Sequence, residues 1–229
     1  MTKKGKFYLS GLFYVLFLAL IVLLCVADRQ PVGAGDTALG LAKLNVQLYK
    51  AFGIGGSGGT GFRPELYKLT ELLGYFAILV LCVFALLGAA QLIRRRSLRK
   101  VDREILAMGG LFILTLVLYV FFEKVIINYR PIVLPGESGP EASFPSSHTV
   151  LVMVILGSVC MVLKKYISIP WLREAMRALC VLLILAMIAG RLLCGCHWFT
   201  DILGGVLLGC ALLALFSAAA DGGAGTVQS

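Results

Sequence analysis

Long apolar runs separated by polar segments dominate the pattern of this chain. The runs are continuous, and they approach the roughly 20 residues that a helix needs to cross the hydrocarbon core of a membrane. A transmembrane β-barrel would instead alternate apolar and polar residues along each strand. The pattern therefore predicts an all-α integral membrane bundle of six helices, at Phe7–Ala27, Leu72–Ile93, Ile105–Phe122, His148–Leu163, Arg177–Gly190 and Asp201–Ala218.

The segments between the runs predict few further elements. Within the long loop of residues 28–71, Thr37–Phe52 has apolar residues at helical spacing, which predicts an amphipathic helix on the membrane surface. The apolar face of this helix is predicted to consist of Leu41, Leu44, Leu48 and Phe52. Gly53–Gly61 predicts a flexible connector, because no Lys-Ser/Thr follows it as in a phosphate-binding loop. We expect one domain over residues 1–219 and a disordered tail over 220–229.

The first apolar run follows three lysines and superficially resembles a secretory signal peptide. Its apolar part is longer than that of an ordinary signal peptide, and Cys25-Val26-Ala27-Asp28 is a poor cleavage site. We therefore expect an uncleaved first span.

The composition agrees with a membrane protein. Hydrophobic residues make up 59% of the chain and charged residues 14%, and the mean hydropathy is +0.93. A soluble domain with this balance could not cover its surface with polar groups.

The excess positive charge falls at one end of the predicted bundle. The basic residues at this end are Lys3, Lys4, Lys6, Arg94, Arg95, Arg96, Arg99, Lys100, Arg103, Lys164, Lys165, Arg173 and Arg177. The acidic residues there are only Asp102, Glu104, Glu174 and Asp221. Because basic loops stay in the cytoplasm, we expect both termini inside and the opposite end outside. We interpret the run Arg94–Lys100 as a topology determinant that touches anionic lipids, and we expect no nucleic-acid partner.

The chain has only two histidines, and each lies in a polar cluster at the predicted outer end. The candidate site residues around them are Lys124, Arg130, Ser146, Ser147, His148, Arg191, His197 and Asp201. Arginine, lysine and the start of a helix are typical ligands of phosphate, so this set favours phosphoryl transfer. A carboxylate at Asp201 would hold one nitrogen of His197 and free the other to attack, while His148 would protonate the leaving oxygen.

Other interpretations of the same residues remain open. A single histidine or arginine at a membrane interface is usually structural, and Asp201 alone would serve as a helix cap. A metal site built from His148, His197 and Asp201 is disfavoured, because the neighbouring cations would repel a metal ion. Cys194-Gly195-Cys196 lacks the CxxC spacing of redox and zinc sites, so we interpret these cysteines as ordinary small residues.

Three motifs, in this order, resemble those of the type 2 phosphatidic acid phosphatase (lipid phosphate phosphatase) superfamily, which read KxxxxxxRP, PSGH and SRxxxxxHxxxD. Here the third is Arg191, His197 and Asp201, the second is Pro145-Ser146-Ser147-His148, and the first is Arg130-Pro131 with Lys124 upstream. The resemblance implies that His197 is the nucleophile forming a phosphohistidine, that Asp201 orients it and that His148 is the acid. It implies phosphate binding by Lys124, Arg130, Ser146, Ser147 and Arg191. It also implies catalysis with no metal and no other cofactor.

The sequence departs from the family motifs at three positions. Lys124 precedes Arg130 by five intervening residues instead of six, which on a helix turns it by about 100°. Ser147 replaces a glycine, and Gly190 replaces the serine before the arginine. None of these changes removes the nucleophile, its carboxylate or the acid.

These observations predict a membrane phosphatase that hydrolyses a lipid phosphate or lipid diphosphate, such as phosphatidic acid or a polyprenyl diphosphate. The small size and short loops favour a bacterial plasma membrane. Two alternatives stay open: a phosphotransferase that passes the phosphoryl group to an alcohol, and a non-catalytic lipid-phosphate binder. A vanadate-dependent haloperoxidase would use a similar anion site, but such enzymes are soluble, so the six predicted spans argue against this activity. The sequence does not determine the oligomeric state.

Overall fold

The computed structural model describes residues 1–54 and 61–221. Within this part of the chain the elements are, in order, α1 (Lys3–Val26), β1 (Gln30–Pro31), η1 (Ala34–Asp36), β2 (Ala38–Leu39), α2 (Ala42–Ala51), α3 (Pro64–Arg95), η2 (Leu98–Lys100), α4 (Arg103–Lys124), α5 (Ser147–Tyr166), α6 (Pro170–Leu193) and α7 (Phe199–Ala220). Every α-helix of the described residues except the ten-residue α2 is long and apolar enough to cross a membrane. The structure thus has six candidate spans in this part of the chain.

Each predicted span overlaps one of these six helices, but the helices extend further into polar sequence. The largest differences are at α3, which begins at Pro64 instead of Leu72, and at α6, which begins at Pro170 instead of Arg177. A proline in the first helical turn is favourable, because the N–H that it lacks would have no partner there. The extension of α3 adds two polar turns that reach the candidate site.

Two predicted flexible segments fall largely outside the described residues. The connector predicted at Gly53–Gly61 is described only at its ends. The tail was predicted to start at residue 220, but Ala220 is the last residue of α7 and the Asp221 carboxylate pairs with Lys6 of α1. The rest of the predicted tail, residues 222–229, is not described.

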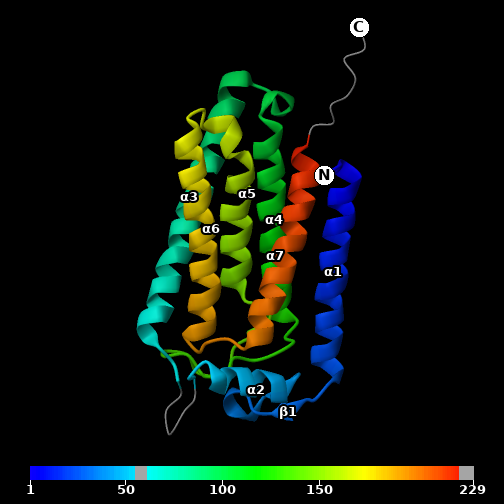
Figure 1. The fold of residues 1–229 in the computed structure, drawn as a ribbon, viewed down its shortest axis with the longest axis vertical. Coiled ribbons are helices and arrows are strands. Elements are labelled where there is room, and N and C mark those ends of the chain that lie inside the picture. The colour runs from blue at the N-terminus through cyan, green and yellow to red at the C-terminus, as the bar shows by residue number, and fades with distance from the viewer. Residues whose placement is uncertain (55–60, 222–229) are drawn as a thin grey trace.

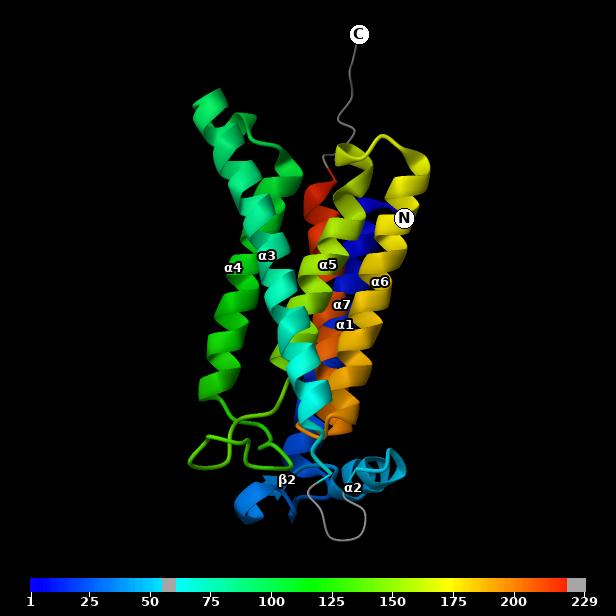
Figure 2. The same ribbon diagram turned by 90° about the vertical axis from the view of Figure 1, so that its left-hand side faces the viewer.

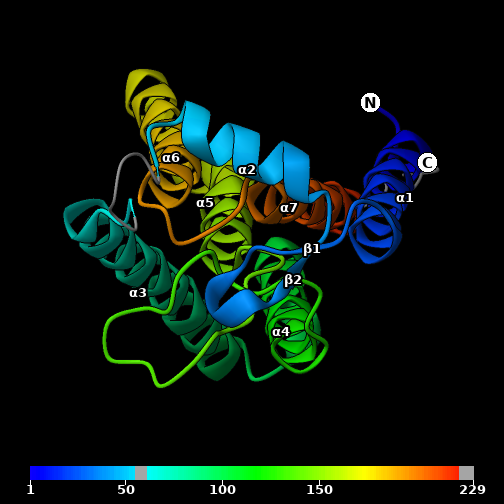
Figure 3. The same ribbon diagram turned by 90° about the horizontal axis from the view of Figure 1, so that it is seen from below.

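Helix α5 lies in the middle of the bundle, where it contacts α3, α4, α6 and α7. Helix α1 packs along α7 on the outside (Figure 3), and the Ser10 hydroxyl donates a hydrogen bond to the Ala211 carbonyl at 2.9 Å. Figures 1 and 2 show the start of α1 and the end of α7 at one end of the bundle and α2 with the β1–β2 hairpin at the other. The predicted basic segments lie at the end where α1 begins and α7 ends.

Glycines on α7 allow it to approach α5 and the segment before it. A Cβ at Gly205 would lie 3.0 Å from Thr149 Cβ, one at Gly209 would lie 3.1 Å from Met153 Sδ, and one at Gly204 would overlap the Phe144 ring. Small residues let the backbones of membrane helices come close together. At the end of this contact the Ser146 N–H donates a hydrogen bond to the Asp201 carbonyl at 3.0 Å, which ties the two histidine-bearing segments together.

An aromatic cluster supports the segment that leads into α5. Phe144 stacks on Phe17 of α1 with ring centroids 5.7 Å apart, and both rings meet Phe122 of α4 edge to face. All three side chains are buried. Such aromatic pairs stabilise beyond the burial of their area, so they fix the position of the Pro145–His148 turn.

Helix α2 lies across the end of the bundle, over the start of α7 (Figure 3). The helix was predicted, but its buried side was not. Asn45 is fully buried, donates to Thr200 Oγ1 and accepts from the Thr200 N–H, whereas Leu44 of the predicted apolar face is 43% exposed. The polar start of α7 is the reason, because its free N–H groups need a partner that Asn45 supplies and a leucine cannot. Tyr49 on the same side packs against Trp198 with the rings tilted and their centroids 5.2 Å apart, so α2 covers the His197 segment from outside.

The glycine contact predicts a difference between two glycine-to-alanine variants. Gly204→Ala should reduce the free energy of unfolding by about 1–3 kcal/mol, because the added methyl group overlaps a buried ring. Gly109→Ala on α4 is the control: nothing lies within 4 Å of its Cβ position, so it should stabilise the helix by up to about 1 kcal/mol. Denaturant-induced unfolding in detergent micelles measures both. Equal stability of the two variants would contradict the packing argument.

Candidate active site

His197 lies in the short segment between α6 and α7 and is only 2% exposed. Its Nδ1 atom is 3.6 Å from Asp201 Oδ2, and its Nε2 atom is 3.3 Å from Arg130 Nη1. The first distance is that of an ion pair and exceeds a normal hydrogen bond. Nδ1 therefore faces a carboxylate, and Nε2 faces a cation.

Asp201 lies in the first turn of α7 and is completely buried. Its Oδ2 accepts a hydrogen bond from the Trp198 N–H at 2.9 Å, as a helix-capping carboxylate does. The capping interpretation and the interpretation as a partner of His197 are thus both compatible with the geometry. The cap holds the carboxylate in place, and the same oxygen faces the imidazole.

The surroundings of His197 disfavour its charged form. Burial lowers the pKa of His197 well below its ordinary value, and the positive charges at Arg130, Arg191 and His148 lower it further. The imidazole is therefore neutral at physiological pH. A neutral imidazole with its Nδ1 proton directed at Asp201 carries an electron pair on Nε2, which accepts the N–H of Arg130 in the structure.

Arg130 is held by a short antiparallel pairing in the segment between α4 and α5. Tyr129 and Ala142 form a β-bridge, and the Arg130 N–H donates to the Glu141 carbonyl at 3.0 Å. The Arg130 side chain pairs with the Glu141 carboxylate at 3.1 Å and donates to the Cys196 carbonyl at 3.3 Å. These contacts place one guanidinium edge beside His197.

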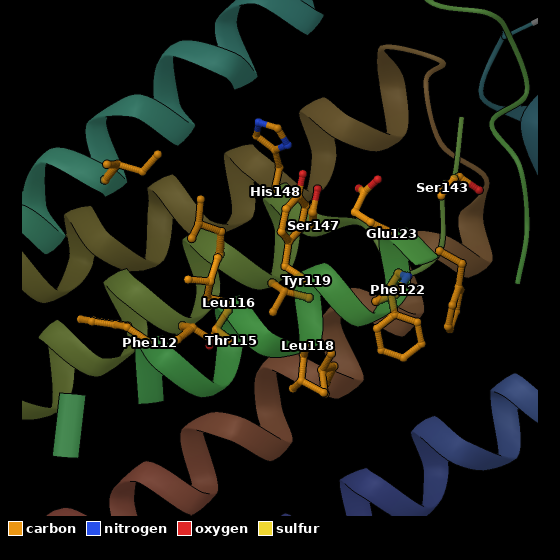
Figure 4. A pocket seen from close by; sticks show the side chains of 18 of the residues that line it. Phe112, Thr115, Leu116, Leu118, Tyr119, Phe122, Glu123, Ser143, Ser147 and His148 are labelled. Carbon is orange, nitrogen blue, oxygen red and sulfur yellow. The ribbon is translucent and has the colours of Figure 1, made fainter. Parts of the chain in front are cut away.

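The start of α5 presents His148 and Ser147 to a common space (Figure 4). His148 Nε2 is 3.2 Å from Glu71 Oε1 of α3, and the imidazole lies against Gly74, where a Cβ would be 3.0 Å from its Cδ2. Ser146, the third residue predicted here, is fully buried and accepts a hydrogen bond from the Thr149 hydroxyl. Ser146 therefore shapes the turn, and Ser147 faces the open space.

Arg191 lies in the last turn of α6 and is 1% exposed. Its Nη2 atom is 2.5 Å from Glu71 Oε1, and its guanidinium lies over the Tyr67 ring at 5.0 Å. Gly190 makes this contact with α3 possible, because a Cβ there would be 2.5 Å from Thr70 Cγ2. The departure from the family serine at position 190 thus has a packing reason.

Glu71 was missed by the sequence analysis, although its carboxylate bridges His148 and Arg191. The predicted span began one residue after it, so Glu71 was assigned to a loop. An acidic residue at the border of an apolar run is a signal that would have identified it.

The two cysteines of the Cys194-Gly195-Cys196 motif were interpreted as ordinary small residues. Both are free thiols and fully buried. The Cys196 carbonyl accepts from Arg130, and its Sγ lies 3.7 Å from Arg191 Nη1. Cys196 therefore helps to position both arginines.

A cavity of ≈ 630 Å³ opens beside these residues. Its polar end is lined by Glu71, Glu123, Arg130, Ser143, Ser147, His148 and His197. The remaining wall is mostly apolar and lies between α3 and α4. It includes Ile78 of α3, and Leu116 and Phe112 of α4 are seen in Figure 4. Because Leu116 is 62% exposed and Ile78 42%, the apolar part opens on the side of the bundle.

Lys124, the remaining predicted phosphate ligand, is not brought to this cavity. It is the last residue of α4 and is exposed, whereas its neighbour Glu123 lines the cavity. Consecutive residues on a helix point about 100° apart. The shortened spacing to Arg130 thus turns the lysine away, and the prediction that Lys124 joins the site is not supported by the geometry.

The described residues contain no group of three His, Cys, Asp or Glu side chains placed to hold a metal ion. The two imidazoles face other partners, His197 Nε2 facing Arg130 and His148 Nε2 facing Glu71. The cavity lining combines the donors Arg130 and His148 with the carboxylates of Glu71 and Glu123, so the donors suited to an anion are already opposed by acidic groups.

Comparisons with known proteins agree with this geometry. A family model described as the PAP2 superfamily matches residues 104–221. No curated protein sequence matches the chain significantly. Among solved structures, the chain is similar to the first transmembrane PAP2 type phosphatidylglycerolphosphate phosphatase from Bacillus subtilis, with a TM-score of 0.64 and 18% identity over 92% of this chain and 94% of that chain. At this identity the likeness shows a common fold. Since the family model matches more than half of its length, the chain belongs to the PAP2 superfamily and is a membrane-bound phosphatase of phosphoric esters.

Proposed function

We propose that this protein hydrolyses a phosphate monoester or a diphosphate carried by a membrane lipid, through a phosphohistidine on His197. The observation that carries the proposal is the position of His197 Nε2. It faces Arg130 at the polar end of a cavity whose other walls are mostly apolar and open between α3 and α4. A phosphate with a long apolar tail fits both halves of this cavity.

In the first step His197 Nε2 attacks the phosphorus, and the bond from phosphorus to the lipid oxygen breaks. His148, on the other side of the polar end, gives its proton to the leaving oxygen. Asp201 stabilises the positive charge that develops on the imidazole of His197. The products of this step are the lipid alcohol, or the lipid monophosphate from a diphosphate, and phosphohistidine.

In the second step a water molecule attacks the phosphohistidine and gives a proton to His148. The bond between phosphorus and Nε2 breaks, and inorganic phosphate leaves with both histidines restored. His148 thus serves as the acid in the first step and as the base in the second.

Arg130, Arg191 and Ser147 are proposed to hold the transferring group. A guanidinium matches two phosphate oxygens at once, and the first turn of α5 adds free N–H groups and the Ser147 hydroxyl. These fixed positive groups do the work that a metal ion does in other phosphatases, so we propose that the reaction needs none. Ser146 supports this turn from behind.

The lipid is proposed to reach the site sideways from the bilayer. The apolar wall extends along α3 from Glu71 to Leu81, which at 1.5 Å per residue is about 15 Å. This length accommodates much of an acyl or prenyl chain while the head group reaches His197. Access from the water side is restricted by α2, which covers the His197 segment.

The site is proposed to face the outside of the cell, with both termini in the cytoplasm. The basic segments lie at the end of the bundle where α1 begins and α7 ends, opposite the histidines. By the positive-inside rule that basic end is cytoplasmic. A bacterial plasma membrane is the proposed location.

Replacing the nucleophile tests the proposed reaction. His197→Ala should reduce phosphate release from lipid phosphates by about 10⁴-fold or more, because the covalent intermediate cannot form. Radiolabelled substrate should label wild-type protein with an acid-labile phosphate and leave this variant unlabelled. The control is Lys124→Ala, which should keep wild-type activity. Assays in detergent with EDTA complete the test: activity that needs a divalent metal, or that survives in His197→Ala, would overturn the proposal.

The pKa of His197 predicts the acid side of the pH profile. The ordinary value is 6.5 and the folded value is lower, so His197 stays neutral and reactive at pH 6.5 and loses activity only further below. Arg130→Met removes one positive charge beside Nε2, which raises the pKa of His197 and moves this acid limb to higher pH. The pH dependence of kcat/KM in both proteins measures the shift. An acid limb that stays in place or moves downward in Arg130→Met would argue against this electrostatic coupling.

Filling the apolar wall should discriminate between substrates by chain length. Leu116→Trp should raise KM for a long-chain lipid phosphate by about fivefold or more, because the indole occupies the space of the tail. A short-chain, water-soluble phosphate ester should be hydrolysed as before. Val117→Trp is the matched control, since Val117 is similarly exposed on α4 but does not line the cavity. Equal effects of both variants, or equal effects on both substrates, would refute lateral access along α3 and α4.

A further inference from the structure

Glu71 is placed where an anion would be expected. Its Oε1 atom is 2.5 Å from Arg191 Nη2 and 3.2 Å from His148 Nε2. These two residues come from α6 and α5, and Glu71 reaches them from α3. The carboxylate oxygen therefore lies at the meeting point of three helices, at the polar end of the cavity.

Glu71 is the main polar partner of the Arg191 side chain. The guanidinium is 1% exposed, its Nε has no hydrogen-bond partner among the described residues, and its Nη1 reaches only the Cys196 sulfur at 3.7 Å. Arg191 does not line the cavity, whereas Glu71 does. A phosphate in the cavity can engage Arg191 directly only if the carboxylate of Glu71 moves away.

Two further residues of α3 accommodate the partners of Glu71. Gly74, three residues after Glu71, leaves room for the imidazole of His148, and Tyr67, four residues before it, carries the guanidinium of Arg191 on its ring. Residues three and four apart share one face of a helix. Tyr67, Glu71 and Gly74 therefore form one face of α3. This face contacts both His148 and Arg191, and the Glu71 carboxylate lies between those two side chains.

A carboxylate and a phosphate satisfy the same donors. Both present oxygen atoms to a guanidinium fork and to an imidazole N–H. Leaving Arg191 buried without a counter-charge in the empty site would be strongly destabilising. A phosphate dianion brings more charge than a single carboxylate, so it can take over these donors.

We propose that Glu71 occupies the phosphate position in the substrate-free protein and is displaced by the phosphate of the substrate. Glu71 is thus an internal competitor, which stabilises the empty site and lowers its affinity for anions. This inference rests on the proposed function, because it assigns Arg191 and His148 to the phosphate. The side chain of Glu71 is 23% exposed toward the cavity, which gives the displaced carboxylate a place to go.

The direct test uses orthovanadate and inorganic phosphate as probes. Glu71→Gln keeps the shape of the side chain and removes its charge, so both anions should bind about tenfold more tightly or better, as expected for a lost charged hydrogen bond to Arg191. Dissociation constants come from ligand-induced shifts of thermal unfolding in detergent, which need no catalysis. Glu71→Ala should change affinity in the same direction, and alanine suits a helix if the glutamine variant folds poorly.

Glu123→Gln is the matched control. Glu123 also lines the polar end of the cavity, but it lies on α4, and the ion pairs of His148 and Arg191 are with Glu71. This variant removes the same charge without freeing either donor, so its gain in anion affinity should be much smaller. An equal gain would mean that Glu71 acts only through the general charge of the cavity, and it would overturn the proposal. Unchanged or weaker anion binding by both Glu71 variants would also overturn it and would make Glu71 a positioning residue for His148.

The outcome for Glu71 is separable from that for the phosphatase reaction. If the wild-type protein released no phosphate from any lipid but Glu71→Gln still bound vanadate more tightly, the anion position would stand and hydrolysis would fail. If the wild-type protein were active and Glu71→Gln bound vanadate no better, hydrolysis would stand and the displacement of Glu71 would fail.

Discussion

The contact between α5 and α7 brings the two histidine-bearing segments to the same cavity. Three glycines on α7 allow the close approach, and at its end the Ser146 N–H reaches the Asp201 carbonyl. His148 lies two residues after Ser146 on one segment, and His197 lies four residues before Asp201 on the other. A bulkier residue at the contact would move the two histidine-bearing segments apart, so the geometry of the site depends on the packing of the bundle centre.

Around this contact the arginines and histidines of the described site each face a carboxylate. Arg130 pairs with Glu141, Arg191 and His148 pair with Glu71, and the neutral His197 faces Asp201. Charges in an apolar bundle need such partners to offset the loss of hydration. The partners differ in position, however: Glu141 and Asp201 lie outside the cavity lining, while Glu71 is part of it. This difference is why we assign Glu71 alone to the position of the substrate.

The six spans could be predicted from local patterns, because an apolar run needs a membrane whatever its neighbours are; the chemistry of the two histidines stays a proposal. The ends of the helices could not be predicted. Pro64 and the polar turns after it read as a loop, and this hid Glu71. Lys124 matched the first family motif in its order along the chain but not in its spacing to Arg130, and at the end of α4 its side chain points away from the cavity. In α2 the spacing of leucines suggested one buried side, and the N–H groups of α7 selected another through Asn45.

By itself the sequence determined the class of the protein, the order of its helices and the set of side chains available for phosphate chemistry. Each of these follows from hydrophobicity or from residue type, which are properties of short segments. Only the tertiary structure decided which oxygen each donor faces, that Glu71 stands between His148 and Arg191, and that the cavity opens between α3 and α4. These features join residues far apart along the chain, and helix packing alone sets the distances between them.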